Sequence, residues 1–468
     1  MTAGLLAPFL DACARFPDRR AIVGRDGVAV SYAELRDGAA ALAGDWRARG
    51  LGPGQRVLVA HPVSIPLYRA LIAVWMSGCS AIFPEPFAGI AGLRHARRLL
   101  EPQWAVSNRV GRLLLPLLAG GGMRMLSPSG RGAPVEPAPP AEPALYSFTS
   151  GSTGAAKCIP RSHALMLAQS AAVSRVLASD RPEVDLVWFP VFVLACLANG
   201  GTAVLPDSAL KRPDRPDTRA LARQAAAEGV TRLLAPPAVA MALAGHGDMP
   251  RLSKLFTGGG PVLPQHFAAL GRIADEVVAI YGSTEAEPVA VLSSHDLAPE
   301  DLDAMRAGAG LLAGRVVEGL DLRIEADEIQ VAGPHVVPAY LDPRHDAGNK
   351  IAEAGCIWHR TGDGGRLDGQ GRLWLRGRLA GRVGGLWPLE VEVAALSHPG
   401  IRAAALARQG DRPVLAVVRA PGAALPEGIG GVARVVELDA LPMDRRHASK
   451  LDYTRLEALI ARRAGRRG

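Results

Sequence analysis

One loop of this sequence combines the residue types that bind phosphate. The extended stretch Leu145–Thr149 leads into small and hydroxylated residues, and a lysine follows shortly afterwards. Backbone N–H groups, hydroxyl groups and an ammonium group all donate hydrogen bonds to phosphate oxygens. We therefore predict a strand that runs into a phosphate loop. The residues predicted to line it are Thr149, Ser150, Gly151, Ser152, Thr153, Gly154 and Lys157.

This loop differs from the common nucleoside-triphosphate loop. It lacks the G-x-x-x-x-G-K-[ST] order, and Cys158 stands where a serine or threonine would hold magnesium. A different ATP chemistry is implied. On composition alone, the same stretch also fits a flexible surface linker.

Two further predicted strands end in glycine-containing loops. Leu255–Thr257 runs into three glycines, and Val277–Tyr281 runs into Gly-Ser-Thr-Glu. In an open parallel sheet, ligands gather beyond the carboxyl ends of the strands, and glycine lets the backbone approach a ligand closely. We expect both loops to face one nucleotide. The candidate residues are Gly258, Gly259, Gly260, Tyr281, Gly282, Thr284 and Glu285.

Three other charged residues that could bind a ligand or stabilise charge lie in short sequence blocks. Asp363 ends Thr-Gly-Asp, Arg378 follows Gly377, and Lys450 ends Arg-His-Ala-Ser-Lys. Taken alone, Asp363 fits an Asx turn, Glu285 fits a surface turn, and Lys450 fits a solvated residue near the end of the chain.

The blocks together resemble those of the adenylate-forming superfamily, which includes acyl-CoA synthetases, peptide-synthetase adenylation domains and luciferases. The phosphate loop is similar to Y-T-S-G-S-T-G-x-P-K-G, with Ala156 and Cys158 replacing the proline and the last glycine. Residues 281–285 match Y-G-x-T-E without departure, and Thr-Gly-Asp and Gly-Arg follow in the family's order. The resemblance covers nearly the whole chain.

The resemblance implies how ATP and metal are held. Tyr281 would pack against adenine, Gly258–Gly260 would line the base, and Thr284 would contact the α-phosphate. Glu285 would hold Mg²⁺, which prefers hard oxygen ligands and keeps several waters.

The same resemblance assigns the remaining charged residues. Asp363 would accept hydrogen bonds from both ribose hydroxyls, and Arg378 would lie beside the ribose. Lys450 would stabilise charge as the α-phosphate is attacked. The segment after Ala380 departs from the family, because it lacks the usual charged residue and is shorter up to Glu390. This departure bears on the geometry of the step that follows adenylation.

An aromatic segment lies where this family builds its acyl or amino-acid pocket. The candidate residues are Trp188, Phe189, Phe192 and Val193, with Val193 at a position where many members have histidine. The segment could be only core, but aromatic residues beside a proline fit a cavity wall. It contains no carboxylate to anchor an α-ammonium group, which favours an apolar or weakly polar acid as substrate.

The order of predicted elements indicates an α/β fold with mainly parallel sheets. A helix capped by Ser31, a strand at 56–60, a helix at about 65–77 and a strand at 81–84 alternate in the first part of the chain. We predict a large domain over residues 1–376 and a small, mobile α/β domain over residues 377–468, which carries the catalytic lysine.

Composition excludes several classes of protein. The chain of 468 residues is 49% hydrophobic and 21% charged, as in ordinary globular proteins. The net charge of +8 comes from scattered arginines, so no nucleic-acid partner is expected. Five widely spaced cysteines fit a reducing cytoplasm. The apolar run at 186–205 is interrupted by proline and glycine, which favours a buried strand-and-loop segment over a membrane span.

We therefore predict an AMP-forming ligase that uses ATP and Mg²⁺ to convert a carboxylic acid to an acyl-adenylate with release of pyrophosphate. The acyl group would pass to a thiol of coenzyme A or of an acyl carrier protein. Local motifs around Lys450 and at 358–378 also resemble β-lactone synthetases of bacterial olefin biosynthesis and fatty-acyl ligases, so closure of a 3-hydroxy acyl-adenylate to a β-lactone is an alternative. A non-catalytic adenylate-binding protein is a third, which intact Glu285, Asp363, Arg378 and Lys450 argue against.

Overall fold

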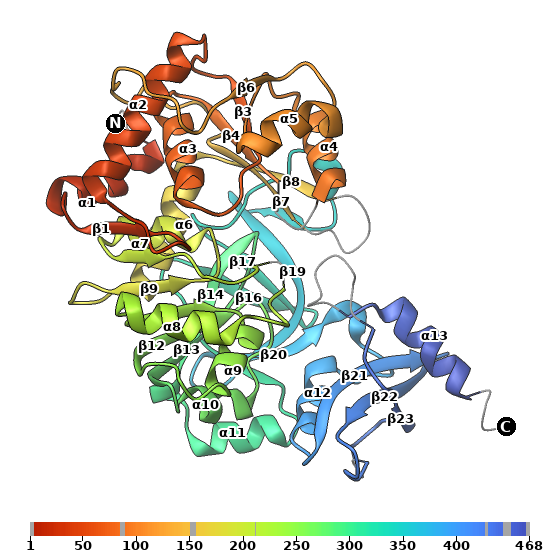
Figure 1. Cartoon of the computed structure of the whole chain (residues 1–468). Coiled ribbons are helices and arrows are strands. Elements are labelled where there is room, and N and C mark those ends of the chain that lie inside the picture. The colour runs from red at the N-terminus through yellow and green to blue at the C-terminus, as the bar shows by residue number, and fades with distance from the viewer. Residues whose placement is uncertain are drawn as a thin grey trace.

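The computed structural model describes residues 4–84, 89–149, 156–210, 212–425, 429–442 and 451–464. Strands in these residues form three sheets with helices packed on their faces (Figure 1). The predicted α/β class is confirmed. The α-helices are α1 (Ala7–Arg15), α2 (Tyr32–Ala48), α3 (Ile65–Met76), α4 (Gly89–Leu100), α5 (Arg109–Ala119), α6 (His163–Val176), α7 (Phe192–Ala198), α8 (Thr218–Glu228), α9 (Pro237–Ala244), α10 (Pro264–Leu270), α11 (Pro299–Arg306), α12 (Pro388–Leu396) and α13 (Tyr453–Ala464).

A six-stranded sheet begins the fold. Its strands are parallel except for the last pair, and helices cover both faces. Residues Val57 and Val59 face α2 and α3, whereas Leu58 between them faces α4 and α5, as the two-residue period of a strand requires. The strands, in sheet order, are β6 (Arg124–Leu126), β5 (Trp104–Val106), β3 (Arg56–Val59), β4 (Ser80–Phe83), β7 (Leu145–Thr149) and β8 (Lys157–Arg161).

A 14-stranded mixed sheet forms the centre of the molecule. Its strands β9 to β13 run parallel and β14 turns back against β13. The strands, in sheet order, are β16 (Asp321–Glu325), β17 (Glu328–Ala332), β19 (Cys356–Leu367), β20 (Arg372–Arg378), β15 (Leu311–Val316), β14 (Ala286–Ser293), β13 (Ala274–Ser283), β12 (Leu252–Gly258), β11 (Arg232–Ala235), β9 (Val184–Val187), β10 (Thr202–Val204), β1 (Arg20–Val23) and β2 (Ala29–Ser31), with β18 (Lys350–Glu353) paired to β19.

The two faces of this sheet bury different helices. Leu233 and Leu255 pack with α8, α9, α10 and α11, whereas Leu234, Phe256 and Val278 pack on the face that carries α1 and α7. Leu234, Phe256 and Val278 are register neighbours across three parallel strands. The sheet therefore presents a continuous apolar surface toward α7, and the candidate site lies at one end of it.

The last part of the chain builds a three-stranded sheet of β21 (Ile401–Gln409), β22 (Arg412–Arg419) and β23 (Arg434–Glu437). Helix α12 packs on one face through Val391 and Ala395, and α13 packs on the other through Leu456 and Ile460. Figure 1 shows this unit at the lower right, beside β20. The domain boundary predicted at residues 376 and 377 falls within β20 and stays a prediction.

Several expected local features are present. Ser31 caps α2 with a reciprocal capping box to Glu34, and Ser162 caps α6 by accepting from the Leu165 N–H. Residues 186–205 contain the end of β9 and all of β10, as expected for a strand-and-loop segment, but they also contain helix α7, which was not predicted. Leucine and alanine favour helix, and the breakers Pro190 and Gly200 lie outside it.

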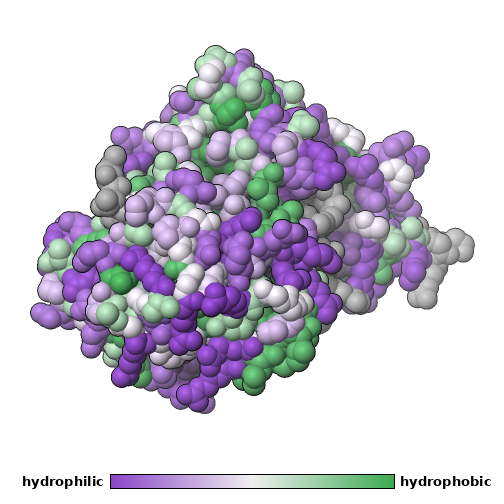
Figure 2. Space-filling model, turned by 90° about the horizontal axis from the view of Figure 1, so that it is seen from above, coloured by the Kyte–Doolittle hydropathy of each residue, from purple (hydrophilic) through white to green (hydrophobic). Residues whose placement is uncertain are grey.

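Hydrophilic and hydrophobic residues are interspersed on the face seen from above (Figure 2). Among the described residues, no helix has the length and apolar character needed to cross a membrane. 

Candidate active site

Two strand ends lie side by side where the sequence predicts the nucleotide. Strands β12 and β13 are parallel neighbours, so their carboxyl ends lie side by side. Gly258 pairs with Ile280 there, and a Cβ on Gly258 would lie only 2.5 Å from the Ile280 carbonyl oxygen. Gly259 and Gly260 follow β12 as exposed residues, and Gly282 is the second-last residue of β13. Glycine at 258 therefore allows the two strand ends to approach closely.

Tyr281, Asp363 and Arg378 form one hydrogen-bonded group. The Tyr281 hydroxyl donates to Asp363 Oδ2 at 2.8 Å, and Arg378 Nε lies 3.0 Å from Asp363 Oδ1. Arg378 also donates to the Thr361 carbonyl at 2.9 Å. Burial and the charge of Asp363 raise the pKa of Tyr281 well above its ordinary value. The structure thus brings together residues that the sequence separates by almost 100 positions.

Glu285 lies in a second polar group. Its Oε1 accepts a hydrogen bond of 2.8 Å from the Tyr340 hydroxyl. Burial acts to raise the pKa of Glu285, but Tyr340, His359 and Lys350 outweigh it and hold that pKa below its ordinary value. Glu285 is therefore an ionised carboxylate in a half-buried position.

Two lysines flank the Tyr340 ring. Lys157 Nζ lies 4.9 Å from the ring centroid and Lys350 Nζ lies 5.5 Å from it. Burial lowers the pKa of Lys350 to about 8. The cluster around Glu285 therefore holds two cations suited to a polyphosphate, and sequence reasoning identified only Lys157. Lys350 and Tyr340 lie in a turn-rich stretch that shows no motif, so sequence alone offered no signal for them.

Arg161 fixes the backbone beside this cluster. Its guanidinium donates to Ser147 Oγ at 2.8 Å, to Gln169 Oε1 at 2.5 Å and to the Thr284 carbonyl at 2.7 Å. These bonds join β7, α6 and the turn that carries Glu285. The Thr284 side chain remains exposed, as a residue that contacts a phosphate must be.

The predicted phosphate loop is described only at its two ends. Buried Thr149 ends β7, Lys157 begins β8, and the two residues pair in an antiparallel register. The predicted strand before the loop is confirmed. Ser150, Gly151, Ser152, Thr153 and Gly154 lie outside the described residues, as does Lys450.

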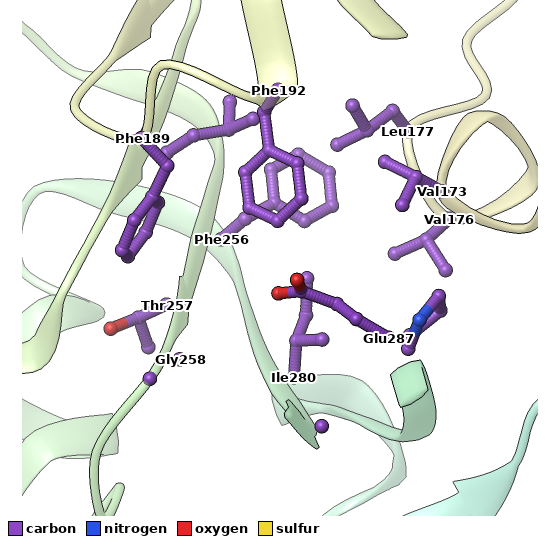
Figure 3. Close-up of a pocket in the computed structure, with 14 residues that line it drawn as sticks. Val173, Val176, Leu177, Phe189, Phe192, Phe256, Thr257, Gly258, Ile280 and Glu287 are labelled. Atoms are coloured by element: carbon purple, nitrogen blue, oxygen red, sulfur yellow. The ribbon is translucent and has the colours of Figure 1, made fainter. Parts of the chain in front are cut away.

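An apolar cavity opens next to the strand ends. It has an empty volume of about 570 Å³, part of which is open to solvent. Helix α6, the segment before α7 and strands β11 to β14 all contribute to it (Figure 3). The lining residues are Val173, Val176, Leu177, Phe189, Phe192, Leu234, Phe256, Thr257, Gly258, Gly259, Ile280, Gly282, Glu287 and Pro288.

The aromatic segment supplies only part of this lining. Phe189 and Phe192 face the cavity with ring centroids 5.5 Å apart. Trp188 and Val193 are not among the lining residues, and both are buried in hydrophobic cores, at 6% and 0% exposure. Trp188 and Val193 therefore belong to the core, which was the alternative stated for this segment. They differ from Phe189 and Phe192 because neighbouring residues at the start of a helix point in different directions.

A carboxyl group enters the cavity from outside the aromatic segment. Glu287 on β14 lines the cavity, and burial raises its pKa to about 7. Sequence reasoning missed it because only the aromatic segment was searched for a carboxylate. Glu285 lies in the turn before β14, so the alternation of a strand gave no signal for Glu287.

A family model described as AMP-binding enzyme matches residues 9–341, more than half of the chain. The chain belongs to the AMP-binding enzyme family. As a member of this adenylate-forming family, it is an AMP-forming ligase that activates a carboxylic acid as its adenylate.

Two curated relatives are similar over most of their length. The olefin β-lactone synthetase of Xanthomonas campestris pv. campestris is 30% identical, over 92% of this chain and 90% of the relative. A feruloyl-CoA synthase from an Amycolatopsis species is 28% identical, over 84% of this chain and 83% of the relative.

Among solved structures, the amide bond synthetase McbA from Marinactinospora thermotolerans superposes with a TM-score of 0.82 at 23% identity. That match covers 98% of this chain and all of the other, so the fold is shared along the whole length.

The residues around Glu285 fit a magnesium ion that arrives with a nucleotide. No cluster of three or more candidate metal ligands occurs in the described parts of the chain. Mg²⁺ needs no such cluster where substrate phosphates and water complete its shell around one or two carboxylates. An ionised Glu285 beside Lys157 and Lys350 meets that requirement.

Proposed function

We propose that this enzyme adenylates a carboxylic acid with a largely apolar chain and then closes it on its own 3-hydroxyl group to form a β-lactone. The observation that carries the first part is the cavity, whose walls are mainly aromatic and branched aliphatic side chains. Such walls favour an alkyl chain because transferring apolar surface out of water is favourable.

In the first step, a carboxylate oxygen attacks the α-phosphorus of ATP, and the bond from that phosphorus to the pyrophosphate oxygen breaks. Asp363 and Arg378 would hold the ribose, Tyr281 would contact the base, and Thr284 with the phosphate loop would bind the α-phosphate. Lys450 would neutralise charge that develops between the carboxylate and the phosphate. These roles rest on the family resemblance together with the positions of the described residues.

Mg²⁺ bound at Glu285 would polarise the phosphates and neutralise the departing pyrophosphate. Lys157 and Lys350 both lie near the Tyr340 ring and would add positive charge there.

In the second step, the 3-hydroxyl oxygen attacks the acyl carbon, the bond from that carbon to the AMP oxygen breaks, and the hydroxyl proton passes to water. The similarity to an olefin β-lactone synthetase over nine-tenths of both chains supports this acceptor. Intramolecular attack also benefits from high effective concentration, because the hydroxyl is bound beside the adenylate.

A second candidate is transfer to a thiol of coenzyme A or of an acyl carrier protein. The similarity to a feruloyl-CoA synthase over 84% of the chain favours it. Both candidates share the adenylation step and differ only in the acceptor.

One experiment separates them. The enzyme is incubated with ATP, Mg²⁺ and 3-hydroxydodecanoic acid, with and without coenzyme A, and the products are identified by mass spectrometry. A product lighter than the acid by one water, formed without thiol, is expected for the lactone. A product that appears only with thiol would overturn lactone formation and support thioester formation.

A further inference from the structure

Glu287 is an unusual component of an apolar cavity. Figure 3 shows its carboxyl group directed into the space between Phe192 and Ile280, near the Phe256 ring. The side chain comes from β14, which packs against α6. It is the one ionisable side chain among the residues that line this cavity.

The Glu287 carboxyl has no hydrogen bond or ion pair with any of the described residues. Arg161 is the cation that acts on it electrostatically. However, the Arg161 guanidinium already donates to Ser147, Gln169 and Thr284. The Glu287 oxygens are therefore available to a ligand in the cavity.

The Glu287 side chain is half-buried, and no described side chain on the cavity walls donates a hydrogen bond to its carboxyl group, so a ligand or water in the cavity can pair with it. Removing a polar group from water without a hydrogen bond is unfavourable, and buried polar groups are almost always paired. A leucine at this position would complete the apolar wall without that cost. The carboxyl group is thus best explained by a donor on the substrate.

We propose that Glu287 is a specificity-determining residue that accepts a hydrogen bond from a hydroxyl group on the substrate's acyl chain. This inference rests on the proposed function and deepens it, because it names the feature of the acid that the pocket recognises. It assigns Glu287 to binding and positioning rather than to the adenylation chemistry.

The position of Glu287 limits where that hydroxyl lies along the chain. Glu287 lies directly beside Gly282, because a Cβ on Gly282 would lie 3.2 Å from the Glu287 Cα, and both residues line the cavity. Its carboxyl therefore lies at the end of the cavity near the nucleotide-binding loops, where the substrate carboxylate must react. A hydroxyl within the first few carbons of the acyl chain reaches it, whereas one at the far end does not.

The surrounding charges favour a hydroxyl over an ammonium group. Arg161 already supplies positive charge to both Glu285 and Glu287. A second buried cation would lose its hydration, and that guanidinium would oppose its attraction to Glu287. A neutral donor avoids both costs.

The test compares the specificity constants for pyrophosphate exchange with 3-hydroxydodecanoic, 12-hydroxydodecanoic and unsubstituted dodecanoic acid. Wild-type enzyme is expected to prefer the 3-hydroxy acid over dodecanoic acid by about 10- to 100-fold, the range for one hydrogen bond to a charged group. The 12-hydroxy acid is expected to gain no such preference. Glu287→Leu should reduce the preference to near unity while dodecanoic acid is still turned over.

Two further variants serve as controls. Glu287→Gln keeps an acceptor oxygen and should retain part of the preference. Glu318→Leu makes the same change at an exposed glutamate, whose side chain is 88% accessible, and should leave the preference unchanged. Melting temperatures of all variants show that each one is folded.

The outcomes distinguish this inference from the proposed function. Exchange with dodecanoic acid but no preference for the 3-hydroxy acid in wild type would overturn the role of Glu287 alone. An undiminished preference in Glu287→Leu would do the same, and a stronger preference for 3-aminododecanoic acid would overturn the hydroxyl assignment. If no acid supports exchange in wild type, the proposed function fails together with the inference.

Discussion

The Tyr281 hydroxyl donates a 2.8 Å hydrogen bond to Asp363 Oδ2, which joins the end of β13 to β19 across the edge that we propose binds the nucleotide. Arg378 holds the other carboxylate oxygen. Asp363 is thus oriented from two sides before a ribose arrives.

Asp363→Asn should raise the KM for ATP by about 10- to 100-fold. A carboxylate has two charged oxygens that can accept from both ribose hydroxyls, whereas an amide has one neutral acceptor oxygen. Pyrophosphate exchange at varied ATP measures this. Tyr281→Phe removes only the orienting hydroxyl and should have a smaller effect. Equal, wild-type KM values in both variants would exclude Asp363 as a ribose ligand.

Glu285→Gln should lower turnover by about 100-fold at limiting Mg²⁺, because it deletes the charge that a hard cation needs. Titration with MgCl₂ at fixed ATP measures the change. Tyr340→Phe is the matched control, since it removes the hydrogen bond to Glu285 but keeps the carboxylate. An unaltered Mg²⁺ requirement in Glu285→Gln would count against the metal role.

Lys450→Ala should slow adenylate formation by about 10²- to 10³-fold while ATP binding persists, because the charge would act on the transition state. Exchange rates and equilibrium dialysis with ATP separate the two effects. Arg455→Ala, which removes an exposed cation from α13, should be near wild type. Normal exchange by Lys450→Ala would remove this residue from the mechanism.

Asp185→Ala should destabilise the protein by about 3–5 kcal/mol, because it leaves the Arg232 guanidinium buried without its partner. The pair is bidentate, with distances of 2.6 and 2.9 Å, and the two side chains are 3% and 0% exposed. Asp275→Ala breaks the exposed pair with Arg251 and should cost about 1 kcal/mol or less. Urea midpoints of the two variants provide the comparison, and equal shifts would contradict it.

Glu287 should make stability depend on pH. Burial raises its folded-state pKa to about 7, above the value of about 4.3 in an unfolded chain. The folded state therefore binds more protons between these values, and this contribution to stability declines as pH rises from about 4.3 to 7. Glu287→Gln removes the titration, so the melting temperature of wild type minus that of the variant should fall across this window. A difference that stays constant or increases would contradict the raised pKa.

Local patterns in the sequence were enough to predict much of the fold and one edge of the candidate site. Ser31 and Ser162 cap helices because capping depends on residues only three positions apart. Strands that end in glycine motifs placed Gly258 and Tyr281 at a common edge, since parallel strands align their carboxyl ends. The sequence by itself also identified the adenylate-forming family, because several short motifs recur in the family's order.

Only the tertiary structure decided which side chains meet. Tyr340 and Lys350 reach Glu285 from a stretch about 60 residues away, and no local pattern encodes such a distance. The same holds for Glu287, which enters the acyl cavity from β14 while Trp188 and Val193 turn into the core. Strand order and register determine these contacts, because they decide which faces of distant segments bury one another.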